Sequence, residues 1–316
     1  MEMYKLILAG LSIFAFTSCS NLTKNQVQPN LDDMLVMRKE QIASAPTPTA
    51  ITSNIIITCK EDLVGYWVGF MQNIDSTEAF VENEYYEENK INLAIDSIQG
   101  SNAFGHSVIE GIERPLRGTF SQIQNLYSFQ MQQPGDDKFD GTFRFTISNS
   151  DSLIKGSWEP FNNSIEQNLA FELSKQQFQY SPDIELDEYS TYYDDTKSKP
   201  IEYGQDEETG EIYYDDAYFM TTEDVKKFNP SKVELKKEDV ENLKQADIFI
   251  LRNSIYARHG YAFRNKQLRR FFSYQDWYVP LHTQIGYALT DIEIKNIDLL
   301  LRYEEHAEAY FDVFGR

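Results

Sequence analysis

The chain has 316 residues, a hydrophobic fraction of 41% and a formal net charge of −21 at pH 7. Such a length is typical of two domains with linkers rather than of one domain. The acidic balance argues against a general nucleic-acid binder, because phosphate recognition needs a net or local excess of Lys and Arg.

The first 19 residues carry the pattern of an export signal. Lys5 precedes an apolar run from Leu6 to Phe16, which is shorter than the ~20 residues that span a bilayer. The sequence from Phe16 to Cys19 resembles the lipobox of bacterial lipoproteins, in the relaxed form found in the Bacteroidota. The resemblance implies removal of residues 1–18, acyl chains such as palmitate on Cys19, and a place in the cell envelope at the outer membrane, on either its periplasmic or its outer face. The alternative is an ordinary secretory signal with an incidental cysteine.

Residues 19–54 are polar and contain three prolines, which is typical of a flexible tether between a lipid anchor and a folded domain. If Cys19 is acylated, Cys59 has no internal cysteine to pair with. Stability must then come from packed cores rather than from a disulfide.

Residues 55–175 predict an antiparallel all-β meander. Short stretches of alternating apolar and polar residues recur, with turn residues between them. The connections are too short for helical crossovers, so neighbouring strands should pair antiparallel. The expected strands are Gly65–Gln72, Asn89–Ile98, Gly105–Ile112, Leu116–Gln122, Tyr127–Gln132, Gly141–Ile147, Ser152–Trp158 and Asn168–Leu173.

Eight such strands favour either a small barrel or a sandwich, because an open sheet leaves unpaired edges. The opening Leu63-Val64-Gly65-Tyr66-Trp67 resembles the Gly-x-Trp start of lipocalin-like domains. That resemblance implies that Trp67 closes one end of the barrel and that the interior holds a small apolar ligand. The alternative is an interior filled by aromatic side chains, as in most small barrels.

Residues 176–221 form an acidic, Tyr-rich stretch that is too poor in aliphatic residues to build a core of its own. From Asp183 to Asp216 there are 13 acidic residues against Lys197 and Lys199. Carboxylates surround Gly210, as they do in calcium-binding loops, but they lack the spacing of an EF-hand loop. A solvated hairpin or linker is therefore the simpler interpretation. The stretch is opposite in charge to the tract from Arg252 to Arg270, which holds six basic and no acidic residues. In a third hypothesis the stretch folds over that tract and regulates access to it, which predicts that deletion of Asp183–Asp216 increases binding to anionic polymers.

From residue 222 to 316 the apolar period becomes helical. Gly260 is expected to end one helix in a left-handed cap. Thr290, with Glu293 three residues later, predicts a capping box at the start of the last helix. The whole chain is thus expected to be α+β, with the β domain followed by a small, mostly helical domain.

The segment from Leu251 to Phe263, with Tyr256-Ala257-Arg258-His259-Gly260 at its centre, resembles the signature of the YARHG domain. The similarity continues through Trp277-Tyr278-Val279-Pro280 and Leu289-Thr290-Asp291-Ile292-Glu293. The resemblance implies a small, mostly helical, extracytoplasmic bacterial domain of undefined biochemical role.

The basic and aromatic residues of this region allow two interpretations. Arg258 and His259 stand beside the capping glycine, where cations interact with helix-end carbonyls, so a structural role is the default. In the functional interpretation, an anion-binding rim lies beside exposed aromatic rings and takes a carboxylate-bearing glycan or peptide. The candidate ligand-binding residues are Tyr256, Arg258, His259, Tyr261, Arg264, Arg269, Arg270, Trp277 and Tyr278.

No catalytic constellation is evident. The four histidines have no metal-ligand spacing, and no phosphate loop or nucleophile elbow occurs. We therefore expect no enzymatic activity, no metal and no cofactor. The expected function is a lipid-anchored envelope protein whose helical domain binds peptidoglycan or an envelope protein, with a lipocalin-like carrier as the alternative.

Overall fold

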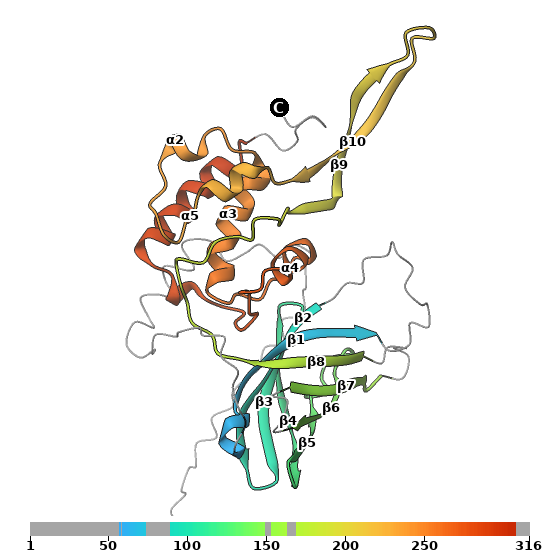
Figure 1. The fold of residues 1–316 in the computed structure, drawn as a ribbon, viewed down its shortest axis with the longest axis vertical. Coiled ribbons are helices and arrows are strands. Elements are labelled where there is room, and N and C mark those ends of the chain that lie inside the picture. Colours follow the sequence, from blue (N-terminus) through green and yellow to red (C-terminus); the bar gives the residue numbers. More distant parts are fainter. Residues whose placement is uncertain (1–56, 58, 74–88, 149–152, 163–168, 308–316) are drawn as a thin grey trace, which may run out of the picture.

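The computed structural model describes residues 57, 59–73, 89–148, 153–162 and 169–307. It shows an eight-stranded β-barrel, a two-stranded arm and a domain that holds the described α-helices, so the α+β class is confirmed. Figure 1 places the helical domain beside the barrel, with the arm projecting from the far side of that domain. Within the described residues, no helix is long and apolar enough to cross a bilayer. Cys19 and the tether lie outside them.

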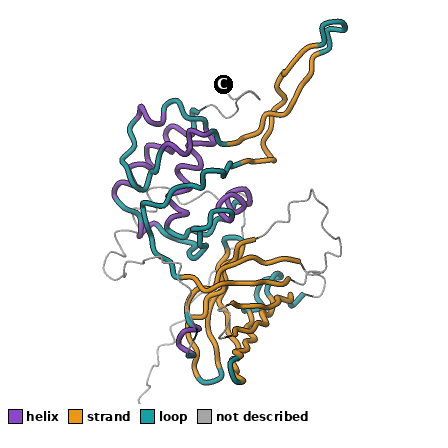
Figure 2. Tube along the Cα trace, viewed as in Figure 1, coloured by secondary structure: helices purple, strands orange, loops and turns teal. Residues whose placement is uncertain are grey.

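The barrel is a closed antiparallel meander in which every strand pairs with the next and β8 returns to β1. This arrangement confirms the predicted meander and selects the barrel over the sandwich. Figure 2 shows that strands make up the barrel and the arm, whereas helices gather in the domain between them. The strands are β1 Gly65–Asn73, β2 Asn89–Gln99, β3 Asn102–Ile109, β4 Ile112–Ile123, β5 Leu126–Gln132, β6 Gly141–Ser148, β7 Leu153–Pro160 and β8 Leu169–Gln176.

The barrel interior is filled by the inward-facing side chains of the eight strands. Phe129 stacks on Phe145 with ring centroids 4.8 Å apart, and Phe143 and Phe171 pack tilted at 5.9 Å. These rings join a cluster of buried aliphatic and aromatic residues contributed by all eight strands. Such filling is normal for a barrel of eight strands.

One barrel end is closed by Trp67 and a short 3₁₀ helix at Lys60–Leu63. Trp67 is fully buried, and its indole N–H donates to the Leu63 carbonyl at 3.0 Å. The ammonium group of Lys175 on β8 lies 5.7 Å from the Trp67 ring centroid, a cation–π distance. Trp67 therefore packs between the interior cluster of the barrel and the 3₁₀ helix.

Residues 193–220 of the acidic stretch form the arm, a hairpin of β9 Tyr193–Gln205 and β10 Ile212–Met220. At its tip, Asp206 accepts hydrogen bonds from the backbone N–H groups of Glu208 and Thr209 and from the Tyr213 hydroxyl. The tip carboxylate thus closes a turn with Gly210, which has a φ of 74°. Within the described residues, no three His, Cys, Asp or Glu side chains gather as a metal site requires.

The helical domain is built around a central helix, α3 (Gln245–Arg258), which is buried on almost every side. The other helices are α2 Lys237–Val240, α4 Lys266–Ser273 and α5 Asp291–Glu304. Helix α3 packs against α5 and ends at Arg258, and Gly260, with a φ of 73°, provides the predicted left-handed cap. The predicted capping box is also present, with Thr290 Oγ1 accepting from Glu293 N at 3.3 Å and the Glu293 carboxylate accepting from Thr290 N at 2.9 Å.

The core of this domain begins well upstream of the expected boundary at residue 222. Tyr192 is buried among Phe219, Phe249 and Phe271, with centroid distances of 5.6 to 6.2 Å. Part of the acidic stretch is therefore core of the helical domain, and only its distal half forms the exposed arm. The sequence did not indicate this division because Tyr192 lies in the same run of charges as the exposed tyrosines.

The barrel and the helical domain meet at the β3–β4 turn. Gly111, with a φ of 72°, lies so close to Phe263 that a Cβ at this position would come within 2.6 Å of the Phe263 backbone. The Gly111 carbonyl accepts a hydrogen bond from Arg264 Nε at 3.1 Å. Val68 on the outer face of β1 packs against Val279 and Leu281. These contacts hold one face of the barrel against the helical domain.

Candidate functional site

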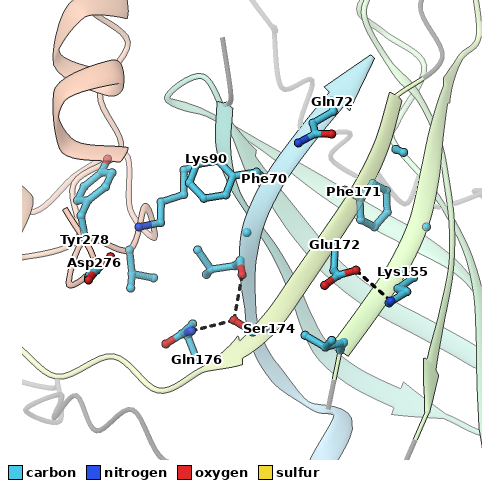
Figure 3. Close-up of a pocket in the computed structure, with 16 residues that line it drawn as sticks. Phe70, Gln72, Lys90, Lys155, Phe171, Glu172, Ser174, Gln176, Asp276 and Tyr278 are labelled. Carbon is cyan, nitrogen blue, oxygen red and sulfur yellow. Dashed lines mark hydrogen bonds and ion pairs between the residues drawn. The ribbon is translucent and has the colours of Figure 1, made fainter. Parts of the chain in front are cut away.

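A groove of about 820 Å³ runs between the outer surface of the barrel and the loop after α4. Its floor is the outward face of β1 and β8, with β7 at the far side. Figure 3 shows the barrel strands on one side and the loop that carries Asp276 and Tyr278 on the other. The lining includes Val68, Phe70, Gln72, Lys90, Leu153, Lys155, Ala170, Glu172, Ser174, Gln176, Asp276, Tyr278 and Val279.

Strand alternation explains why β1 serves both the barrel core and the groove. Trp67 and Met71 belong to the interior cluster, so Val68 and Phe70 between them point outward. The loop wall is fixed by Pro280, which holds the preceding residue extended. The same segment is anchored to the helical domain, since the Gly260 carbonyl accepts from Leu281 N at 2.8 Å and from His282 N at 3.0 Å.

The electrostatics of the groove differ between its two ends. Lys155 and Glu172 neutralise each other at 3.1 Å at the β7–β8 end. At the other end, Lys90 lies between Phe70 and Tyr278, with its ammonium nitrogen 5.9 Å from each ring centroid. Burial lowers the pKa of Lys90 to about 8, although the charge of Asp276 acts in the opposite direction.

The residues Tyr256 to Gly260 lie in the core of the helical domain. Arg258 is only 1% exposed, donates from Nε to the Ile184 carbonyl at 2.8 Å and from Nη1 to Ser254 Oγ at 2.7 Å. Its burial lowers the pKa of the guanidinium to about 10, against the opposing effect of nearby carboxylates. His259 Nε2 lies 2.8 Å from Glu293 Oε2, and the imidazole stacks on Tyr180 at 4.1 Å. The pentapeptide thus joins the end of α3 to α5 and to the incoming segment 180–185.

The family model of the YARHG domain matches residues 217–305. The chain carries a YARHG domain. The comparison with curated proteins finds no match. The matched region starts after Tyr180 and Tyr192, although both side chains pack into the YARHG domain.

The three other candidate arginines, Arg264, Arg269 and Arg270, contact the barrel turn or the arm. Arg269 lies 3.3 Å from the Glu110 carboxylate at the β3–β4 turn, next to the contact of Arg264 with Gly111. Arg270 lies 3.5 Å from the Asp195 carboxylate of the arm and donates to the Tyr193 carbonyl at 3.0 Å. The acidic stretch therefore does pack on the basic tract, at Arg270, in accordance with its opposite charge.

The expected anion-binding rim is not assembled as one exposed surface. Tyr256, Arg258 and His259 are buried at the end of α3, where segment 180–185 and α5 cover Arg258 and His259. Tyr278 is buried against Phe263 and Phe272. Arg264, Arg269 and Arg270 point to two different neighbours, the barrel turn and the arm. The structural interpretation of Arg258 and His259 accounts for their contacts.

Among the aromatic candidates, only Tyr278 reaches the groove. Its ring lines the groove wall, and its hydroxyl donates to the Tyr261 carbonyl at 2.8 Å. Tyr261 and Trp277 are half-buried and pack against the helical core. Lys90 was not singled out in the sequence, since a lysine at a strand start gives no sign of a wall formed by residues 275–279.

Proposed function

We propose that the chain is a non-enzymatic binding protein of the bacterial cell envelope, anchored at the outer membrane by an acylated Cys19. Its ligand is a component of the cell wall or another envelope component. The anchoring rests on the resemblance of Phe16 to Cys19 to a lipobox, and the groove between the barrel and the YARHG domain is the single observation that carries the binding role. Binding sites are usually concave and combine apolar walls with a few placed polar groups, and this groove combines Val68, Phe70, Leu153 and Ala170 with charged and polar side chains.

The lipocalin-like carrier alternative receives less support from the geometry. Phe129, Phe143, Phe145 and Phe171 occupy the interior positions where a ligand would lie. The groove, in contrast, lies on the outside of the barrel and is shared by both domains.

Sedimentation with isolated peptidoglycan sacculi tests the proposal, using the full chain in mild detergent. Ala170→Trp places an indole on the outward face of β8 inside the groove, whereas Thr119→Trp places the same group on the exposed face of β4. We expect the wild type and Thr119→Trp to sediment with sacculi, and Ala170→Trp to bind at least about tenfold more weakly. Equal binding by both variants would exclude the groove, and no binding by the wild type would exclude the cell wall as the ligand.

A further inference from the structure

Lys90 is held in a position that suits ligand recognition. Its side chain extends from β2 of the barrel towards the loop of the YARHG domain that carries Asp276 and Tyr278, as Figure 3 shows. The ammonium group donates to the Gln275 carbonyl at 3.1 Å. The rings of Phe70 and Tyr278 flank it from the barrel and from the loop. The side chain therefore has a fixed direction and a largely dehydrated charge.

The charge of Lys90 is incompletely matched within the described part of the chain. The hydrogen bond to Gln275 uses one of the three donors of the ammonium group. No described carboxylate lies within ion-pair distance of it, since Asp276 acts on it only at longer range. A half-buried cation with spare donors, at the end of an open groove, is suited to accept an anionic group.

The rest of the groove limits the size and charge of that anion. Apolar side chains extend away from Lys90 along the floor, including Val68, Phe70, Ala170 and Leu153. The charged lining groups are Lys90 and Lys155 against Asp276 and Glu172, which sum to zero. Asp276 repels any anion that pairs with Lys90, but it repels a dianion about twice as strongly as a monoanion, so a single negative charge is favoured.

We propose that the groove binds a ligand with one carboxylate on an apolar chain, with the carboxylate paired to Lys90 and the chain lying along β1 and β8. This inference rests on the proposed function and specifies the chemistry of its ligand. Both the free end of a peptide and the head of an acyl chain carry such a carboxylate. The affinity of the pair is expected to be substantial, because hydrogen bonds to charged groups in a dehydrated site are the stronger ones.

Paired probes that differ only at the carboxylate test this chemistry, with the full chain held in amphipol and titrated by calorimetry. One pair is acetyl-Ala-Val-Ala with a free or an amidated C-terminus, and the other is decanoate with decanamide. In the wild type, one of the two acids should bind at least about tenfold more tightly than its amide, and the pair that shows the difference identifies the source.

Lys90→Met keeps the length of the side chain and removes its charge, and Lys295→Met is the matched control on an exposed lysine of α5. The preference for the acid should disappear in Lys90→Met and persist in Lys295→Met. It should also decline as the pH rises through about 8, where Lys90 loses its proton. Among the described residues, the groups that face Lys90 are the Gln275 carbonyl, Asp276, Tyr278 and Phe70. Burial raises the pKa of Tyr278, which keeps that phenol neutral over this range.

Equal binding of acid and amide by the wild type would overturn the inference, as would an unchanged preference in Lys90→Met. These results are separable from those of the sacculus assay. If Ala170→Trp abolishes sacculus binding while the acid preference is absent, the proposed function stands and the ligand chemistry is wrong. If the acid preference is present without sacculus binding, the groove chemistry stands and the cell wall is not its source.

Discussion

The Glu293 carboxylate shows how the YARHG signature stabilises the domain. Its Oε1 accepts a hydrogen bond from the Tyr180 hydroxyl, and its Oε2 lies 2.8 Å from His259 Nε2. Oε2 also accepts from the Thr290 backbone N–H, which completes the capping box of α5. One buried side chain thus joins the signature, the last helix and the incoming segment. Loss of its charge should affect folding rather than ligand contact.

Glu293→Gln tests this role through its pH dependence. Burial acts to raise the pKa of Glu293, but its interactions with His259 and Thr290 outweigh burial and hold that pKa below 4.5. A lowered pKa in the folded state gives stability that is present above 4.5 and is lost as the pH falls through the folded value. The variant should lose about 3 kcal/mol of unfolding free energy at pH 7, because it breaks a buried pair.

Urea denaturation of both proteins from pH 7 to pH 3 measures this difference. The gap in unfolding free energy between wild type and Glu293→Gln should narrow as the pH falls below 4.5, because the carboxylate is then protonated in the unfolded chain before it is protonated in the folded one. Glu238→Gln, at an exposed position on α2, should follow the wild type throughout. A gap that stays constant with pH would show that the charge of Glu293 contributes nothing.

At the scale of elements, the barrel strands could be predicted because each one is specified locally. Alternation along β1, for example, separates Trp67 and Met71 inside from Val68 and Phe70 outside. The caps at Gly260 and Thr290 are likewise set by neighbours within a few residues. The partners of the arginines and of Lys90 depend on contacts as far as 185 positions away, as between Lys90 and Gln275. For this reason the sequence predicted the strands and the caps, whereas the long-range partners of the arginines and of Lys90 could not be predicted from it.

The arm should be removable without loss of the YARHG core. Replacing residues 201–215 by Asn-Gly joins Pro200 to Asp216, which are already opposite each other, through a favoured two-residue hairpin loop. The unfolding free energy should change by no more than about 0.5 kcal/mol, as for other surface changes. Tyr192→Ala, in the buried part of the same stretch, should cost about 3 to 5 kcal/mol. Denaturant titration of the two variants measures both changes in unfolding free energy and shows whether the arm is exposed while Tyr192 belongs to the core.

The shortened arm also tests whether the acidic stretch keeps anionic polymers away from the basic tract. Deletion of Asp183–Asp216 is a poorer test, because it would also remove the buried Tyr192. Residues 201–215 contain six acidic residues and no Lys or Arg, namely Glu202, Asp206, Glu207, Glu208, Glu211 and Asp215. Their loss should increase binding to polyglutamate at low salt, and added salt should cancel the increase. Unchanged binding at low salt would show that the arm does not screen the basic tract.

At the scale of the whole molecule, the groove exists only while the two domains stay together, because its walls come from both. The β3–β4 turn is the critical contact, and it depends on the absence of a side chain at Gly111. Gly100, in the turn between β2 and β3, has a similar positive φ of 62° but has no neighbouring atom within 4 Å of a would-be Cβ. Substitution of each glycine in turn therefore distinguishes the effect of backbone strain from the effect of a steric clash between the domains.

Gly100→Ala and Gly111→Ala should each cost the barrel about 1 to 2 kcal/mol, because both place a Cβ at positive φ. Only Gly111→Ala should also push the domains apart, since its Cβ would come within 2.6 Å of the Phe263 backbone. We expect a larger radius of gyration by small-angle X-ray scattering and faster proteolysis between β8 and Tyr192 in Gly111→Ala alone. Acid preference in the groove should be lost in the same variant, because Lys90 would lose Gln275 and Tyr278 together. If both variants kept the wild-type radius and the wild-type preference, the β3–β4 turn would not be what holds the groove together.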